Sequence, residues 1–134
     1  TTEIYTLSLH DALPIYTYNA GISLDFPMSS GRDFFAQLDY AVVGPTWFHV
    51  MQTDNSRNSL FGAPMAYDKT DREKYSTINL RVGIKTDNMS IVAFAKNLTD
   101  EDYLAEVIPA VEFGGVFAHP GPRKRIGLEV TYQF

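Results

Sequence analysis

Cysteine is absent from this sequence of 134 residues, which excludes disulfide bonds and thiolate metal sites. Long hydrophobic runs are absent too, since no apolar stretch approaches the roughly 18 residues that a transmembrane helix requires. The net charge is −5 and no basic stripe occurs, so we predict no binding of nucleic acid. Because there is no P-loop, no ordered set of Ser, His and Asp and no metal-ligand spacing, we predict that the protein is not an enzyme and holds no cofactor.

Residues 1–15 read TTEIYTLSLHDALPI, which resembles the translation of a common sequencing-library adapter, matched in one reading frame. The ordinary alternatives are an N-terminal strand or a signal peptide. A signal peptide fits badly, because a basic n-region is lacking and His10, Asp11 and Pro14 interrupt the apolar stretch. We therefore expect residues 1–15 to be non-native and residues 16–134 to be the native part, which begins in the middle of a gene.

Alternation of apolar and polar residues is the main feature that is present, and it predicts β-strands with one apolar and one polar face. Five stretches show it: residues 17–26, 34–43, 78–85, 89–97 and 125–134. The apolar positions of the last stretch are Ile126, Leu128, Val130, Tyr132 and Phe134. That stretch has about the length, roughly 9–11 residues, that a tilted strand needs to cross a bilayer.

Short and long connections alternate between these predicted strands. Residues 27–31 and 87–88 have the composition of tight turns, whereas residues 46–74 and 98–122 are long and lack periodicity. Outer-membrane barrels have this alternation, because their periplasmic turns are short and their extracellular loops are long. The sequence therefore predicts an all-β fold, an antiparallel meander of about five strands that forms the C-terminal part of a transmembrane β-barrel.

The two faces of the predicted strands differ in polarity. In hydrocarbon every backbone N–H and C=O must be paired, so strands that cross a membrane belong to a closed barrel with apolar side chains toward lipid. The positions predicted to face the lumen include Asp25, Gln37, Asp39, Arg81, Lys85 and Glu129. Aromatic residues lie near predicted strand ends, as in the aromatic girdles of membrane proteins, although strands are also rich in aromatics for other reasons.

Two segments resemble the end of TonB-dependent outer-membrane receptors. The first reads FAKNLTDEDY and resembles the family's (K/R)NLFD-x-x-Y segment, with Thr99 in place of Phe. Its matching residues are Asn97, Leu98, Asp100 and Tyr103. The second resembles the ending PG-x-PR-x-(Y/I)-G…F, with a spacing one residue shorter. Its matching residues are Pro120, Gly121, Arg123 and Gly127, followed by Phe134.

This resemblance covers residues 16–134 and implies a plugged barrel of about 22 strands, of which these are the last five. Such receptors import ferric siderophores, cobalamin, haem or oligosaccharides, energised by the inner-membrane TonB–ExbB–ExbD complex. The resemblance implies the bacterial outer membrane as location, with lipid and lipopolysaccharide as neighbours. It also implies that Val130, Tyr132 and Phe134 form the signal read by the barrel-assembly machinery. The plug and the TonB-contacting box lie N-terminal in this family, so we expect contact with TonB only through that region.

Several other residues are candidates for a site. Asn97 and Asp100 are predicted to cap loops. Residues 100–102 are acidic and predict either a divalent-cation site or, more simply, a solvated acidic loop. Three loop residues are candidates for contact with a ferric ligand, although lone loop histidines usually have no such role: His49, Met51 and His119.

Two alternatives remain open from the sequence. The first is a passive porin or a barrel enzyme, which shares the architecture but has neither plug nor TonB. The second is a soluble β-sandwich or a lipocalin-like binding module, for which short strands and turns also fit. In that module the apolar faces of the strands would pack on one another.

Overall fold

The computed structural model describes residues 14–28, 31–49, 52, 60–64, 67–110 and 112–134. The predicted adapter-derived segment therefore lies outside the described residues, except for its last two positions. Over the described part, no helix has the length and apolar character needed to cross a membrane. The chain forms two compact units. The sheet unit comprises Tyr18–Val42, Ser76–Glu101 and Pro122–Phe134, and the loop unit comprises Thr1–Thr17, Val43–Tyr75 and Asp102–Gly121.

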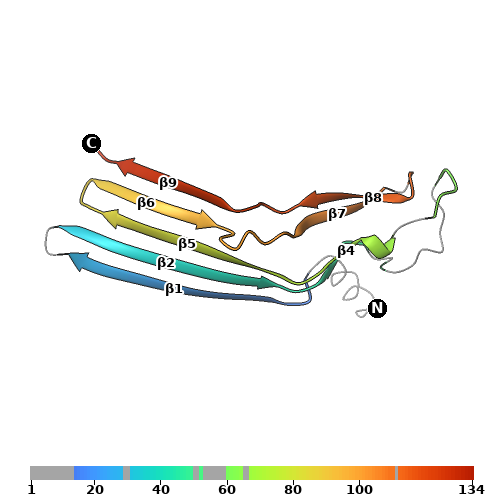
Figure 1. Ribbon diagram of the computed structural model, residues 1–134, viewed down its shortest axis with the longest axis horizontal. Coiled ribbons are helices and arrows are strands. Elements are labelled where there is room, and N and C mark those ends of the chain that lie inside the picture. The colour runs from blue at the N-terminus through green and yellow to red at the C-terminus, as the bar shows by residue number, and fades with distance from the viewer. Residues whose placement is uncertain (1–13, 29–30, 50–51, 53–59, 65–66, 111) are drawn as a thin grey trace, which may run out of the picture. The chain divides into compact units, whose positions relative to one another are not determined.

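A five-stranded antiparallel sheet makes up the sheet unit, with the strand order β1-β2-β5-β6-β9 (Figure 1). Its strands are β1 (Thr17–Met28), β2 (Arg32–Val43), β5 (Tyr75–Lys85), β6 (Met89–Lys96) and β9 (Arg125–Tyr132). Each strand pairs with the strands beside it in the order of the chain, so the predicted antiparallel meander of five strands is confirmed.

The register of β5, β6 and β9 decides which side chains share a face. Leu80 lies opposite Ala95, which lies opposite Ile126, and the neighbouring row joins Arg81, Phe94 and Gly127. Directly opposed residues of an antiparallel pair point to the same side of the sheet. The large apolar side chains of β5 and β9 therefore share one face and their charged side chains the other, whereas β6 also places Val92 and Phe94 on the polar face.

The apolar face of the sheet is exposed. Ile126 and Leu128 retain 73% and 68% of their accessible surface. The same face exposes large side chains on every strand: Tyr18, Ile22, Leu24, Phe26, Met28, Leu38, Tyr40, Ile84, Met89, Ile91, Val130 and Tyr132. By contrast, Val92 and Gly83 on the opposite face are buried. Close packing in this unit thus lies on the polar face, beneath Phe35 and Phe94.

The loop unit contains two short sheets in segments that the sequence predicts to be irregular. β3 (Thr46–Trp47) pairs with β4 (Asp71–Arg72), which follows the 3₁₀ helix η1 (Tyr67–Lys69). β7 (Leu104–Ala110) pairs with β8 (Gly115–Pro120) as an antiparallel hairpin.

The expectation of an irregular segment over residues 98–122 was therefore wrong. The strands were missed because they contain Pro109 and Pro120, and a proline within a stretch of residues argues against a strand there. A bulge between Leu104 and Glu106 also breaks the period of two. Gly114 closes the hairpin at φ 72°, and its N–H donates to the carbonyl of Ala110 at 3.0 Å.

Candidate functional site

Asn97 follows the last residue of β6 and holds the first motif to the second. Its backbone has φ 48°, which Asn tolerates better than most residues, and its side chain is 95% buried, with 5% exposure. The side-chain Nδ2 donates to the carbonyl oxygens of Glu101 at 2.9 Å and Pro122 at 3.1 Å. Its Oδ1 accepts the N–H of Glu101 at 2.9 Å. Both the nitrogen and the oxygen of the Asn97 amide thus form hydrogen bonds that stabilise the connection between β6 and β9.

Asp100 makes a second link between the two motifs. Its Oδ1 accepts the backbone N–H of Lys124 at 2.9 Å. This hydrogen bond lowers the pKa of the Asp100 carboxyl; partial desolvation opposes the shift, and the charges of Arg123 and Lys124 add to it. Among the described residues, no group of three or more His, Cys, Asp or Glu side chains could hold a metal ion, residues 100–102 included.

Two further motif residues, Tyr103 and Gly121, meet in the loop unit. The N–H of Gly121 donates to the carbonyl of Tyr103 at 2.7 Å, and the Tyr103 ring covers the Gly121 Cα so closely that a Cβ there would overlap it. The Tyr103 ring stacks on Tyr75, with centroids 3.9 Å apart and planes 6° apart. Only glycine fits beneath such a ring, which explains this motif position.

Arg72 extends this stack, and sequence reasoning missed it. Its guanidinium lies 4.9 Å from the centroid of Tyr75 and 5.2 Å from that of Phe48. Its Nη1 donates to the carbonyl of Leu104 at 3.0 Å and its Nη2 to Oγ1 of Thr46 at 2.8 Å. Arg72 thus fastens β7 to β3 within the loop unit. No sequence pattern marks it, because it lies in the charged, aperiodic stretch YDKTDREK.

The other residues of the two motifs and of the predicted assembly signal lie on strands or close to strand ends. Leu98 is 38% exposed, and its N–H donates to the carbonyl of Ile78 at 2.8 Å. Arg123 is exposed, and Pro120 is the last residue of β8. Val130 and Tyr132 lie on the apolar face, and the Tyr132 ring meets Phe134 edge-on at 5.3 Å.

The histidine candidates lie on different segments of the loop unit. His49 stacks on Tyr67 with centroids 4.7 Å apart, and His119 lies on β8 opposite Glu106. Met51 lies outside the described residues.

The polar face of the sheet carries charged side chains around two hollows. Arg81 and Glu129 form an ion pair at 3.5 Å, and Gln37 donates to the Asp39 carboxylate at 3.1 Å. One hollow has a volume of about 320 Å³. Its lining includes Gln37, Asp39, Asn79, Arg81 and Lys96. The second has about 340 Å³ and is lined by Asp25, Pro27, Asp33, Phe35 and Lys85. Both hollows are thus lined by charged groups of both signs.

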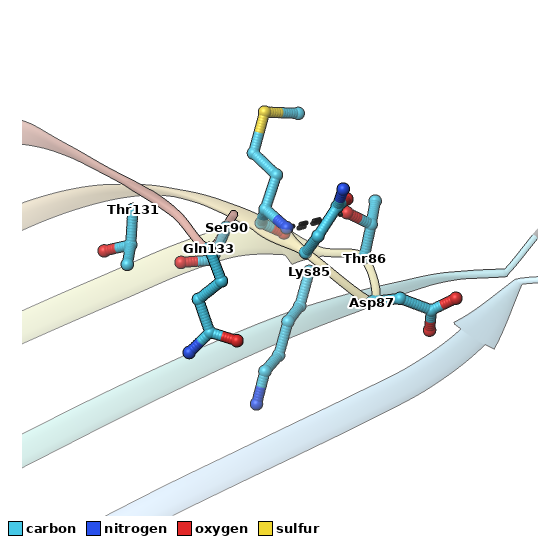
Figure 2. A pocket seen from close by; sticks show the side chains of 8 residues that line it. Lys85, Thr86, Asp87, Ser90, Thr131 and Gln133 are labelled. Atoms are coloured by element: carbon cyan, nitrogen blue, oxygen red, sulfur yellow. Dashed lines mark hydrogen bonds between the residues drawn. The ribbon is translucent and has the colours of Figure 1, made fainter.

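A third hollow lies at the turn between β5 and β6 (Figure 2). The N–H of Met89 donates to Oγ1 of Thr86 at 3.1 Å, and the N–H of Gln133 donates to the carbonyl of Asn88 at 2.9 Å. Lys85 and Gln133 point away from the strands on the same side (Figure 2). These bonds serve the turn and tie the end of β9 to it, so the hollow is part of the hairpin's structure.

Comparisons with known proteins place the fold. No family model matches the sequence, and no curated protein matches it either. Among solved structures, the crystal structure of the ferric yersiniabactin uptake receptor FyuA from Yersinia pestis is similar, with a TM-score of 0.69 and 17% sequence identity. The similarity covers 90% of this chain and 16% of the receptor chain. The five-stranded antiparallel sheet thus has the fold of a segment of that receptor.

Proposed function

We propose that this chain is a segment of the barrel wall of a TonB-dependent outer-membrane receptor, which imports a scarce nutrient. The exposed apolar face, continuous over all five strands, is the single observation that carries the proposal. Monomeric soluble proteins rarely expose an apolar patch larger than a few hundred Å², and larger patches mark contact with protein or membrane. Lipid is the partner that fits a face running along every strand.

The distribution of charge supports lipid contact on that face. By register, Arg81, Lys85, Lys96 and Glu129 all lie on the opposite face of the sheet. A basic residue turned to the middle of a bilayer would cost about 2–4 kcal/mol. The sheet thus follows the alternation of a barrel wall, with apolar side chains toward lipid and polar ones toward the lumen.

The choice of an uptake receptor rests on the motifs and the fold. The two segments that resemble the receptor ending bind each other directly, through Asn97 to Pro122 and through Asp100 to Lys124. The fold similarity is to a receptor that takes up ferric yersiniabactin. A ferric siderophore is accordingly the first substrate class to test, before cobalamin, haem and oligosaccharides.

The proposal also assigns partners and orientation. The apolar side of β9, with Val130 and Tyr132 and then Phe134, would be read by the barrel-assembly machinery. Short turns would lie in the periplasm and the loop unit among the extracellular loops. Contact with TonB would come from a part of the receptor outside this chain.

Two alternatives make different predictions. A passive porin would have the same sheet and would lack a plug. A soluble binding module would pack its apolar faces on one another, whereas over the described residues the apolar face of the sheet remains open.

Resequencing the gene across the codons for Ile15 and Tyr16, with a different library chemistry, tests the receptor proposal. We expect the codons of residues 1–15 to be replaced by a reading frame that encodes more alternating strands and, farther upstream, a plug domain. Alternating strands without a plug would support the porin instead. Persistence of residues 1–15 in the genome, directly after a start codon, would contradict both barrel proposals.

A further inference from the structure

Two segments of the loop unit that lie far apart in the sequence contact each other: residues 43–75 and residues 102–121, which include the hairpin of β7 and β8. An isolated hairpin of two strands is marginally stable at best. Val107 and Ala110 of β7 are nevertheless only 2% and 5% exposed, so other parts of the chain cover them. The hairpin therefore depends on contacts beyond its own two strands.

The first contacts between the two segments lie at the base of the hairpin, around Arg72. Its Nη1 donates to the carbonyl of Leu104, the first residue of β7, at 3.0 Å, and its Nη2 donates to Oγ1 of Thr46 at 2.8 Å. The guanidinium also contacts the rings of Phe48 and Tyr75, and its Nε is buried. One side chain thus joins the start of the hairpin to three positions of the other segment.

A pair of stacked rings adds to the base. Tyr75 stacks on Tyr103 with centroids 3.9 Å apart. The carbonyl of Tyr103 accepts the N–H of Gly121, the residue directly after β8, at 2.7 Å. The chain that enters the hairpin and the chain that leaves it are therefore both tied to Tyr75.

The second contacts lie at the tip of the hairpin. Phe113, in the turn after β7, stacks on Phe61 with centroids 6.2 Å apart. Gly114 lies so close to the same segment that a Cβ there would be 2.7 Å from the carbonyl oxygen of Pro64 and 2.9 Å from Cβ of Ala63. Residues 43–75 thus contact the hairpin at both of its ends.

We propose that these two loops form one cooperative unit, which opens and closes as a whole and is latched at its base by Arg72. Proteins open locally in contiguous cooperative units, and here each loop supplies contacts at both ends of the other. Arg72 is the latch because its hydrogen bonds are charge-assisted and its guanidinium lies against aromatic rings. A ligand or partner that holds either loop would thereby hold both. This goes beyond the proposed transport function and does not depend on it.

Hydrogen–deuterium exchange of the full chain in detergent micelles, read by mass spectrometry, tests the latch. We expect Arg72→Gln to speed exchange about tenfold or more in residues 67–75 and also in β7 and β8, because hydrogen bonds from a charged group are lost. Lys69→Gln is the matched control, since it removes a positive charge that pairs only with Asp68, at 3.6 Å on the surface. It should leave exchange in both loops within about twofold.

Phe113→Ser tests the coupling from the other end. The Phe113 ring is 68% exposed, so its removal leaves no core cavity. It should nevertheless speed exchange at the base, at the N–H groups of Phe48 and Thr70, by about threefold or more. Phe117→Ser is its control, because Phe117 is 64% exposed on β8 and has no ring contact among the described residues.

The exchange of β6, in the sheet unit, shows whether a variant still folds. If Arg72→Gln also speeds exchange in β6, Phe113→Ser decides the matter alone. Faster exchange confined to the loop that carries the substitution would show two independent loops and overturn the inference. Exchange of β7 and β8 at the rate of unprotected amides in the wild type would overturn it as well.

Discussion

Asn97 combines near-complete burial, positive φ and three side-chain hydrogen bonds, and these make it the residue on which the β6–β9 connection most depends. We expect Asn97→Ala to lower the free energy of unfolding by about 2–4 kcal/mol, because the carbonyls of Glu101 and Pro122 and the N–H of Glu101 all lose their partner in a part-buried connection. Urea titration of the protein in lipid vesicles would measure the change.

Asn97→Gly is the matched control for the backbone contribution. Glycine loses the same hydrogen bonds but adopts φ 48° without a steric cost. It should therefore be more stable than Asn97→Ala by about 1 kcal/mol. Equal stability of Asn97→Ala and the wild type would show that these hydrogen bonds do not hold the connection.

The carboxylate of Asp100 predicts a dependence of stability on pH. Its pKa is lower in the folded state than the ordinary value of 3.8, mainly because of the Lys124 N–H. Ionised Asp100 therefore stabilises the fold above about pH 4, and this contribution is lost as the pH falls through the lower, folded-state pKa. Asp100→Asn keeps an acceptor for the Lys124 N–H but removes the charge.

The stability difference between wild type and Asp100→Asn should favour the wild type at pH 7 and shrink steadily below the ordinary value of 3.8. Urea midpoints at pH 7, 5, 3 and 2 would show it. A difference that stays constant over this range would rule out a role for the Asp100 charge.

At the scale of elements, aromatic rings over glycines fix the pairing of neighbouring strands. A Cβ at Gly127 would lie 2.5 Å from Cζ of Phe94, its direct cross-strand partner, and Phe35 covers Gly83 in the same way. We expect Gly127→Ala to destabilise the sheet by about 1–3 kcal/mol, because the ring must move. In a Phe94→Ala background the same change should cost much less, which a double-mutant cycle would measure.

Gly115→Ala serves as the control for the loss of glycine alone, since nothing lies within 4 Å of a Cβ there. It should leave stability within about 0.5 kcal/mol of the wild type. If the effects of Gly127→Ala and Phe94→Ala on stability are additive, contact between the Phe94 ring and Gly127 does not contribute to the stability of the sheet.

The five strands could be predicted from sequence because a period of two survives in them, although Val92 and Phe94 make both faces of residues 89–97 partly apolar and leave the facing of that strand undecided by sequence. β7 and β8 could not, because their prolines and the bulge at Leu104 and Glu106 disrupt the pattern. The motif resemblance identified Asn97, Asp100, Tyr103 and Gly121, yet their contacts join positions far apart in the chain. Arg72 depends wholly on such contacts, so no local pattern could indicate it.

For the whole molecule, the exposed apolar face predicts behaviour in solution. Without lipid or detergent, that face and the outer edges of β1 and β9 would associate with other copies. We expect the chain to aggregate in plain buffer and to become monodisperse in detergent, as judged by size-exclusion chromatography with light scattering. A clean monomer in plain buffer would contradict the membrane proposal.

The most direct test of the lipid-facing sheet uses the absence of native cysteine. Single cysteines at Leu128, Glu129, Val130 and Thr131 would be spin-labelled in the full chain reconstituted in lipid vesicles. Lipid-facing positions collide with dissolved oxygen, and water-facing positions collide with a water-soluble nickel chelate. We predict high oxygen accessibility at 128 and 130 and high nickel accessibility at 129 and 131. Accessibility without this alternation, or with the opposite phase, would contradict a sheet that turns its apolar face to lipid.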